Sequence, residues 1–101
     1  MPARIQPEAE RLAEFCRRRH VRRLSVCGSV LRADFRPDSD IDVLIEFDPD
    51  RRPGMVGLQE VEEELSELYG GHRIDLLNPK YLNRRIRERL LQEAEVLFAE
   101  R

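Results

Sequence analysis

The chain has 101 residues, of which 41 % are hydrophobic and 38 % are charged, and its formal net charge is −2. This length predicts a single domain over residues 1–101, and the composition argues against disorder, against a membrane-spanning segment and against a protein that coats nucleic acid. Two cysteines are too few for a secreted disulfide scaffold, so we expect a cytoplasmic location and no contact with a membrane.

The N-terminal part of the chain predicts a helix, a short strand and then a break in regular structure. Apolar residues recur at helical spacing over residues 7–19, and Pro7 is well placed near a helix start. A strand is expected over residues 23–27. The residues that follow it are able to form one turn of helix over 29–33.

The clearest predicted strand covers residues 41–47, directly after a run of turn-forming residues. Because side chains alternate along a strand, we expect Ile41 and Val43 to share one face. Asp40 and Asp42 then share the other face, at the start of the strand. The alternation predicts a strand with one apolar side and an acidic beginning.

The C-terminal half predicts a helix over residues 56–69, a strand over 73–77 and a final helical region that begins at Asn78-Pro79. The expected buried stripe of this last helix consists of apolar residues at helical spacing: Leu82, Ile86, Leu90, Ala94 and Leu97. The predicted order is therefore α-β-α-β-α-β-α, which is typical of a two-layer α/β or α+β domain. The pattern does not determine the strand order.

The acidic pair at the start of the clearest strand indicates a cation site. Two carboxylates about 5 Å apart repel each other by roughly 3 kcal/mol at an effective dielectric constant near 20. A divalent cation relieves this repulsion, and hard carboxylate oxygens suit Mg²⁺ together with the phosphates of a substrate. The alternative is that Asp40 and Asp42 are a solvated pair that caps the turn before the strand.

Gly28 and Ser29 follow the first predicted strand, where backbone amides and a hydroxyl are able to hold a phosphate. The same dipeptide is also common in ordinary turns. The segment is not a P-loop, because its glycine is not followed by the Gly-Lys-Ser/Thr of that motif. Together with the acidic pair, Gly28-Ser29 predicts a phosphate cradle that faces a metal site.

Gly28-Ser29, ten further residues and then Asp40-Ile41-Asp42 resemble the G-S-x10-D-x-D signature of the DNA polymerase β-like nucleotidyltransferase superfamily. With Arg32, Ser39 and the run DIDVLIEF, the chain is similar to the minimal nucleotidyltransferases (MNT) of prokaryotes over nearly its whole length. The resemblance implies the minimal nucleotidyltransferase fold, in which helices flank a short mixed three-stranded sheet. Val30 and Ala33 depart from the pattern of many relatives, which puts the shape of the nucleotide loop in doubt.

The resemblance also implies a third carboxylate on a neighbouring strand, and Asp75 occupies the matching position. Asp is depleted in strands, so its presence there calls for a reason. The alternative to a catalytic role is an ion pair of Asp75 with Arg73 or Arg84.

By resemblance, the catalytic and metal-binding residues are Asp40, Asp42 and Asp75. Asp40 and Asp42 would hold two Mg²⁺ ions, and Asp75 would either complete the second metal site or take the proton of the acceptor hydroxyl. Gly28 and Ser29 would grip the β- and γ-phosphates of a nucleoside triphosphate. Arg32 and Ser39 would complete the nucleotide site, although Arg32 is equally suited to an ion pair with a nearby aspartate.

The family resemblance further implies the acceptor and the partner. A minimal nucleotidyltransferase transfers AMP from ATP to a tyrosine of a HEPN ribonuclease toxin and so acts as its antitoxin. Two other functions stay open: a non-catalytic module that neutralises its partner by occlusion, and a nucleotidyltransferase for small molecules. A homodimer or a hetero-oligomer is compatible with the apolar C-terminal segment.

Overall fold

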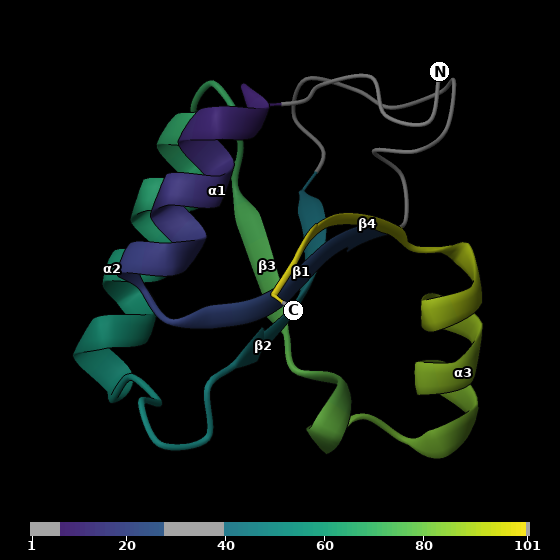
Figure 1. Cartoon of the computed structure of the whole chain (residues 1–101). Helices are drawn as coiled ribbons and strands as arrows, with labels where there is room; N and C mark the ends of the chain where they lie inside the picture. Colours follow the sequence, from purple (N-terminus) through teal and green to yellow (C-terminus); the bar gives the residue numbers. More distant parts are fainter. Residues whose placement is uncertain (1–6, 28–39, 101) are drawn as a thin grey trace.

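The computed structural model describes residues 7–27 and 40–100, so the predicted turn of helix over 29–33 lies outside the described residues. The elements, in chain order, are α1 (Ala9–Arg18), β1 (Val21–Cys27), β2 (Ile41–Phe47), α2 (Met55–Leu68), β3 (Ile74–Leu77), the 3-10 turn η2 (Pro79–Tyr81), α3 (Arg84–Glu93) and β4 (Glu95–Ala99) (Figure 1). The first five of these helices and strands match their predictions to within two residues at each end. No helix of the described residues is long and apolar enough to cross a membrane.

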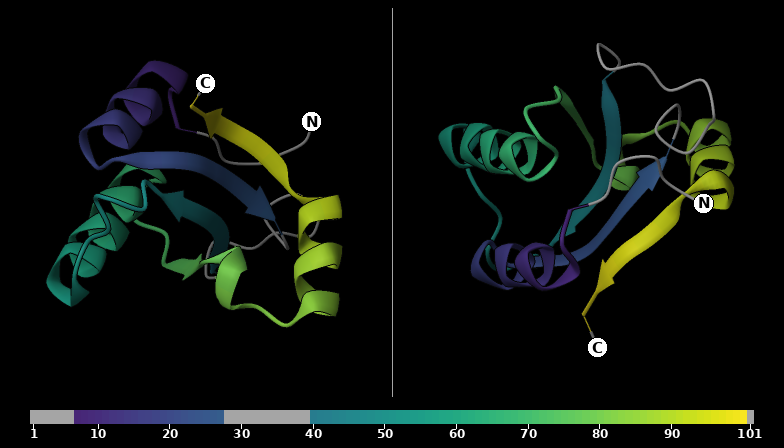
Figure 2. Two further views of the ribbon diagram at one scale, coloured as in Figure 1. Left: turned by 60° about the horizontal axis from the view of Figure 1, so that its bottom comes forward. Right: turned by 90° about the horizontal axis from the view of Figure 1, so that it is seen from above.

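The strands form one mixed four-stranded sheet in the order β3-β2-β1-β4. β1 pairs antiparallel with both β2 and β4, whereas β2 and β3 run parallel. α1 and α2 pack beside each other, and α3 lies away from them across the strands (Figure 2). The acidic strand β2 is therefore one of the two central strands, between β1 and β3.

The hydrophobic core lies between the sheet and the pair α1 and α2. Alternate residues of the two central strands, including Val26 and Val43, are fully buried and face the helices. α1 contributes Leu12 and Phe15 to this core because its apolar residues lie on one stripe, and α2 contributes Leu65. Each such side chain stabilises the fold by about 1.5–3 kcal/mol through burial of apolar surface.

The prediction of one long final helix is wrong. The side chain of Asn78 caps only η2 by accepting from the backbone N–H of Lys80, and a second cap at Asn83 begins α3. α3 has no buried residue, and Ile86 of the predicted buried stripe is 52 % exposed. The helix then ends at Glu93, and the following residues form β4.

β4 is a strand because the edge of β1 offers backbone hydrogen bonds to a segment rich in β-forming residues. Val96, Leu97 and Phe98 favour strands, and β4 pairs with β1 over residues 95–99. The predicted sheet of three strands therefore has four. Leu97 belongs to this strand and packs against the core from there.

Candidate active site

Two of the three predicted catalytic carboxylates are direct neighbours across strands. Asp42 of β2 is in register with Asp75 of β3, so their side chains leave the sheet on the same face. Paired strands lie about 4.8 Å apart, which sets the scale of the separation between the two residues. Asp42 is partly buried and Asp75 is exposed. The parallel pairing of β2 and β3 is therefore what brings together residues that are far apart in the sequence.

The acidic residues near the start of β2 also act on the ionisation of Asp42. Burial raises the pKa of the Asp42 carboxyl, and the negative charges of Asp75 and Asp40 raise it further. Asp40 lies directly before β2 and is exposed. One edge of the sheet therefore concentrates three negative charges.

The alternative role of Asp75, an ion pair with an arginine, is not found in the described part of the chain. Arg73 Nε lies 4.0 Å from Asp40 Oδ1, and both side chains are largely exposed. Arg84 pairs instead with Glu88 on its own helix. Asp75 therefore has neither of the two arginines that could have given it a purely structural role.

The carboxylates fit a magnesium ion. Within residues 7–27 and 40–100, no group of three or more His, Cys, Asp or Glu side chains is placed so that it could hold a metal ion by itself. Mg²⁺ is commonly held by one or two carboxylates and by substrate phosphates, so it does not need such a cage. Asp42 and Asp75 supply the two carboxylates, and the repulsion that raises the pKa of Asp42 is what a cation would relieve.

Cys27 is the last residue of β1 and pairs with Asp42 of β2. Asp42 therefore lies between Cys27 on one neighbouring strand and Asp75 on the other. The thiol is buried, and it donates a long hydrogen bond to the carbonyl oxygen of Asp42 at 3.8 Å. Burial raises the pKa of Cys27 to about 11, and Asp42, Glu93 and Asp75 add to the shift. The thiol therefore stays protonated at neutral pH and is not a nucleophile.

The environment of Cys27 identifies a carboxylate that sequence analysis did not single out. Glu93 ends α3, and its charge reaches the Cys27 thiol. Helical periodicity in the sequence did not indicate that Glu93 ends a helix, because α3 stops where the chain turns into β4 and pairs with β1.

Gly28, Ser29, Arg32 and Ser39 lie outside the described residues. The phosphate cradle and the nucleotide contacts assigned to them therefore stay predictions.

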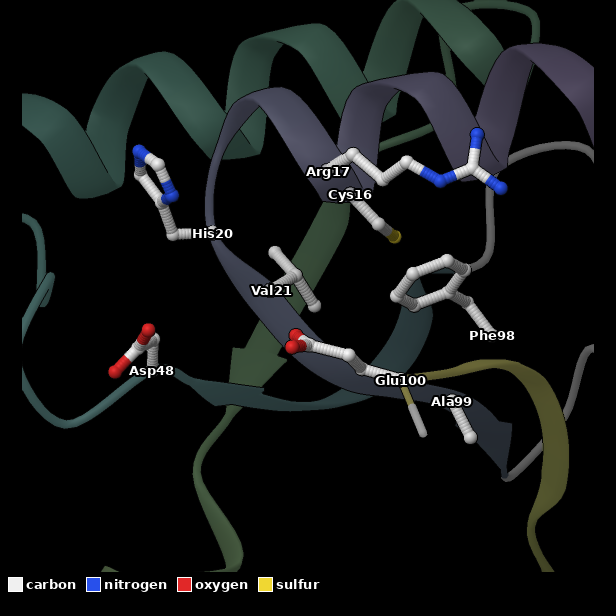
Figure 3. A pocket seen from close by; sticks show the side chains of 8 residues that line it. All are labelled: Cys16, Arg17, His20, Val21, Asp48, Phe98, Ala99 and Glu100. Carbon is white, nitrogen blue, oxygen red and sulfur yellow. The ribbon is translucent and has the colours of Figure 1, made fainter.

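A cavity of about 540 Å³ lies at the other end of the sheet (Figure 3). Apolar and charged side chains line it: Cys16, Arg17, His20, Val21, Asp48, Phe98, Ala99 and Glu100. β1 begins at Val21 and reaches Asp42 only at its other end, a span of roughly 20 Å. This cavity is separate from the carboxylates and contributes nothing to their chemistry.

Comparison with known proteins shows the family to which the chain is similar. A family model described as a nucleotidyltransferase domain matches residues 9–97. The protein adenylyltransferase MntA of Thermococcus cleftensis is 36 % identical over 73 residues, which are 72 % of this chain and 71 % of that relative.

Solved structures agree with this match. A structure assigned to a minimal nucleotidyltransferase superimposes with a TM-score of 0.71 at 33 % identity and covers 86 % of both chains. A chain in the complex of the tri-AMPylated Shewanella oneidensis HEPN toxin with an MNT antitoxin gives a TM-score of 0.63 at 13 % identity, covering 90 % of this chain and 69 % of that one. The second likeness shows the fold alone.

Proposed function

This chain belongs to the nucleotidyltransferase domain family, and we propose that it transfers AMP from ATP to a tyrosine of a HEPN ribonuclease toxin. By this modification it would silence the toxin and act as its antitoxin. The observation that carries the proposal is the pairing of Asp42 with Asp75 in a chain that is 36 % identical to a protein adenylyltransferase.

The described carboxylates share a role in metal binding, and Asp75 has a second role in proton transfer. Asp40, Asp42 and Asp75 would hold Mg²⁺, which when bound neutralises the triphosphate and lowers the pKa of the acceptor hydroxyl. The acceptor oxygen attacks the α-phosphorus, the bond to the bridging oxygen of the β-phosphate breaks, and pyrophosphate leaves. Asp75 is exposed and is able to take the proton of the hydroxyl.

Nucleotide binding is assigned to the motif residues that precede β2. Gly28 and Ser29 would hold the β- and γ-phosphates through backbone N–H groups and a hydroxyl. Arg32 and Ser39 would complete the nucleotide site. The motif's spacing from Asp40 supports these assignments.

We choose the acceptor from the names of similar proteins. MntA of Thermococcus cleftensis is named a protein adenylyltransferase, and a structure of the same fold comes from a complex with a tri-AMPylated HEPN toxin. A HEPN protein is therefore the partner that we expect to carry the acceptor hydroxyl.

The proposal is tested by labelling. The tagged protein is purified from its own host with its co-purifying partner, and Mg²⁺ and ATP labelled at the α-phosphate are added. We expect whole AMP units on a tyrosine of the partner. Asp42→Asn should lower transfer at least 100-fold, because it removes a central metal ligand.

Asp50→Asn is the matched control, because Asp50 is an exposed residue of the turn after β2. It should transfer AMP like the wild type. Full transfer by a folded Asp42→Asn variant would contradict the proposed metal site. A stable complex that takes up no label with any nucleotide would instead support neutralisation by occlusion.

A further inference from the structure

The cavity at the end of the sheet away from the carboxylates is enclosed by parts of the chain that are far apart in the sequence (Figure 3). The end of α1, the start of β1 and the residues that follow β2 and β4 meet around it. The backbone N–H of Asp48 donates to the carbonyl oxygen of His20 at 2.9 Å, which joins the end of β2 to the turn between α1 and β1. The volume of about 540 Å³ lies within the range of roughly 300–1,000 Å³ that is typical of ligand pockets. The cavity is therefore large enough for a small molecule.

Part of the lining of this cavity is apolar. Cys16 and Val21 contribute to it and are themselves buried, with exposed fractions of 0 % and 1 %. Phe98 is partly buried, packs against the core and lines the same cavity. A buried thiol behaves as a small apolar group, so the lining combines aliphatic, aromatic and sulfur surface. An apolar group of a ligand would be stabilised here by its removal from water.

Charges of both signs also line the cavity, and they do not neutralise each other. In Figure 3 the guanidinium group of Arg17 lies on the same side as the Phe98 ring, and the carboxylates of Asp48 and Glu100 lie across from it. In the part of the chain that the structure describes, no ion pair joins Arg17 to either carboxylate. Asp48 Oδ1 accepts a hydrogen bond from the N–H of Asp50 at 3.0 Å, which holds this carboxylate at the end of β2. The separated charges leave room for a ligand with one charge of each sign.

We infer that this cavity binds a free amino acid with an apolar side chain, in its zwitterionic form. The carboxylate of the ligand pairs with Arg17, and its ammonium group pairs with Asp48 and Glu100. Its side chain lies against Val21 and Phe98. An amine or a carboxylic acid of the same shape would satisfy the charges on only one side of the cavity. The site is distinct from Asp42 and Asp75, and the inference does not rest on the proposed function.

An NMR titration of the isotope-labelled full chain with L-phenylalanine tests the inference. We expect the backbone amide signals of Val21, Asp48 and Phe98 to shift, and those of Asp42 and Asp75 to stay in place. Phenethylamine has no carboxylate and phenylpropanoate has no ammonium group. Each should bind at least about threefold more weakly than phenylalanine, because it loses the ion pairs on one side of a partly exposed cavity.

Two variants assign the charges of the ligand to the two sides of the cavity. Arg17→Gln should weaken the binding of phenylalanine about threefold without weakening that of phenethylamine, which has no carboxylate to lose. Glu100→Gln should weaken the binding of phenylalanine and phenethylamine but not that of phenylpropanoate. Arg11→Gln is the matched control, because it removes the same charge as Arg17→Gln from an exposed position of α1 outside the cavity. It should bind all three probes like the wild type.

The inference is overturned if phenylalanine, up to its solubility limit, shifts none of the amide signals around the cavity. Shifts centred on Asp42 and Asp75 overturn it as well. Equal affinity for phenylalanine and phenethylamine excludes a zwitterion site. A loss that Arg17→Gln and Arg11→Gln share would show that net charge, and not the cavity, is responsible. None of these results bears on AMP transfer, which the labelling of Asp42→Asn tests separately.

Discussion

The surroundings of Asp42 disfavour the negatively charged form of its carboxyl group. It is partly buried, and the nearby carboxylates of Asp75 and Asp40 raise its pKa in addition to the effect of burial. Side chains in such positions usually have a cationic partner. The structure supplies none for Asp42 among the described residues within ion-pair distance, which is the pattern expected where the partner is a ligand.

The first consequence is a gain in stability when this charge is removed. The folded-state pKa of Asp42 is raised, so its ionisation destabilises the fold as pH rises through that pKa. At pH 7, metal-free Asp42→Asn should therefore be more stable than the wild type, by less than about 1 kcal/mol because solvent screens a partly exposed carboxylate, and its Tm should be higher by at most roughly 5 °C.

Thermal unfolding in EDTA at a series of pH values measures this difference. It should shrink as pH falls through the folded pKa of Asp42, which lies above the ordinary value of about 3.9. Asp50→Asn should leave Tm unchanged. A less stable Asp42→Asn variant at pH 7 would mean that the carboxylate has a structural partner.

At the scale of elements, α1 and α2 are joined by a cluster of ion pairs. Arg18 Nη2 donates to Glu64 Oε2 at 2.8 Å, and Arg19 donates to the other oxygen of the same carboxylate. Both Arg19 and Glu64 are 26 % exposed. Burial alone would raise the pKa of Glu64, but the hydrogen bonds from the two arginines outweigh it and lower the pKa.

This cluster predicts a pH-dependent effect of Glu64→Gln. Because the folded-state pKa of Glu64 is lowered, its contribution is present above the unfolded pKa and is lost as pH falls through the folded pKa. We expect the variant to be about 1 kcal/mol less stable at pH 7, and no less stable than the wild type near pH 3. Urea unfolding of the variant and the wild type at both pH values measures this difference in the free energy of unfolding.

Glu67→Gln provides the comparison, because Glu67 is exposed on the same helix. Its stability should follow that of the wild type at both pH values. A loss in Glu64→Gln that is the same at pH 3 as at pH 7 would show that packing, and not charge, is responsible.

At the scale of the molecule, the pair of carboxylate residues at the candidate site exists only when the sheet is assembled. Asp42 and Asp75 lie on different strands, and about 30 residues separate them in the chain. The unfolded chain therefore has no such site. Ligands that bind only the folded state stabilise it by mass action.

We expect Mg²⁺ and a non-hydrolysable ATP analogue, at about 100 times their dissociation constants, to stabilise the wild type by about 2.7 kcal/mol. Scanning calorimetry should show this as a rise in Tm of roughly 10 °C. Asp42→Asn should lose most of the rise and Asp50→Asn should keep it. Equal rises in all three proteins would place the nucleotide elsewhere, for example in the cavity near His20.

The sequence by itself determined most of the local elements, and it supplied the predicted residues of the site. The amphipathic stripe of α1, the alternation in β2 and the stop after α2 are short-range patterns, and each predicted its element closely. Asp40 and Asp42 were recognisable from a motif of fixed spacing, whereas Asp75 was assigned through the family resemblance.

Only the tertiary structure decided the strand order, the register of Asp42 with Asp75, and β4. Over a short window, apolar residues such as Leu90 and Leu97 fit either a helix or a strand. Leu90 lies in α3, whereas Leu97 lies in a strand because β4 pairs with the free edge of β1. Strand pairing joins residues that are distant in the chain, so the local pattern that predicts an element carries no information about its neighbours.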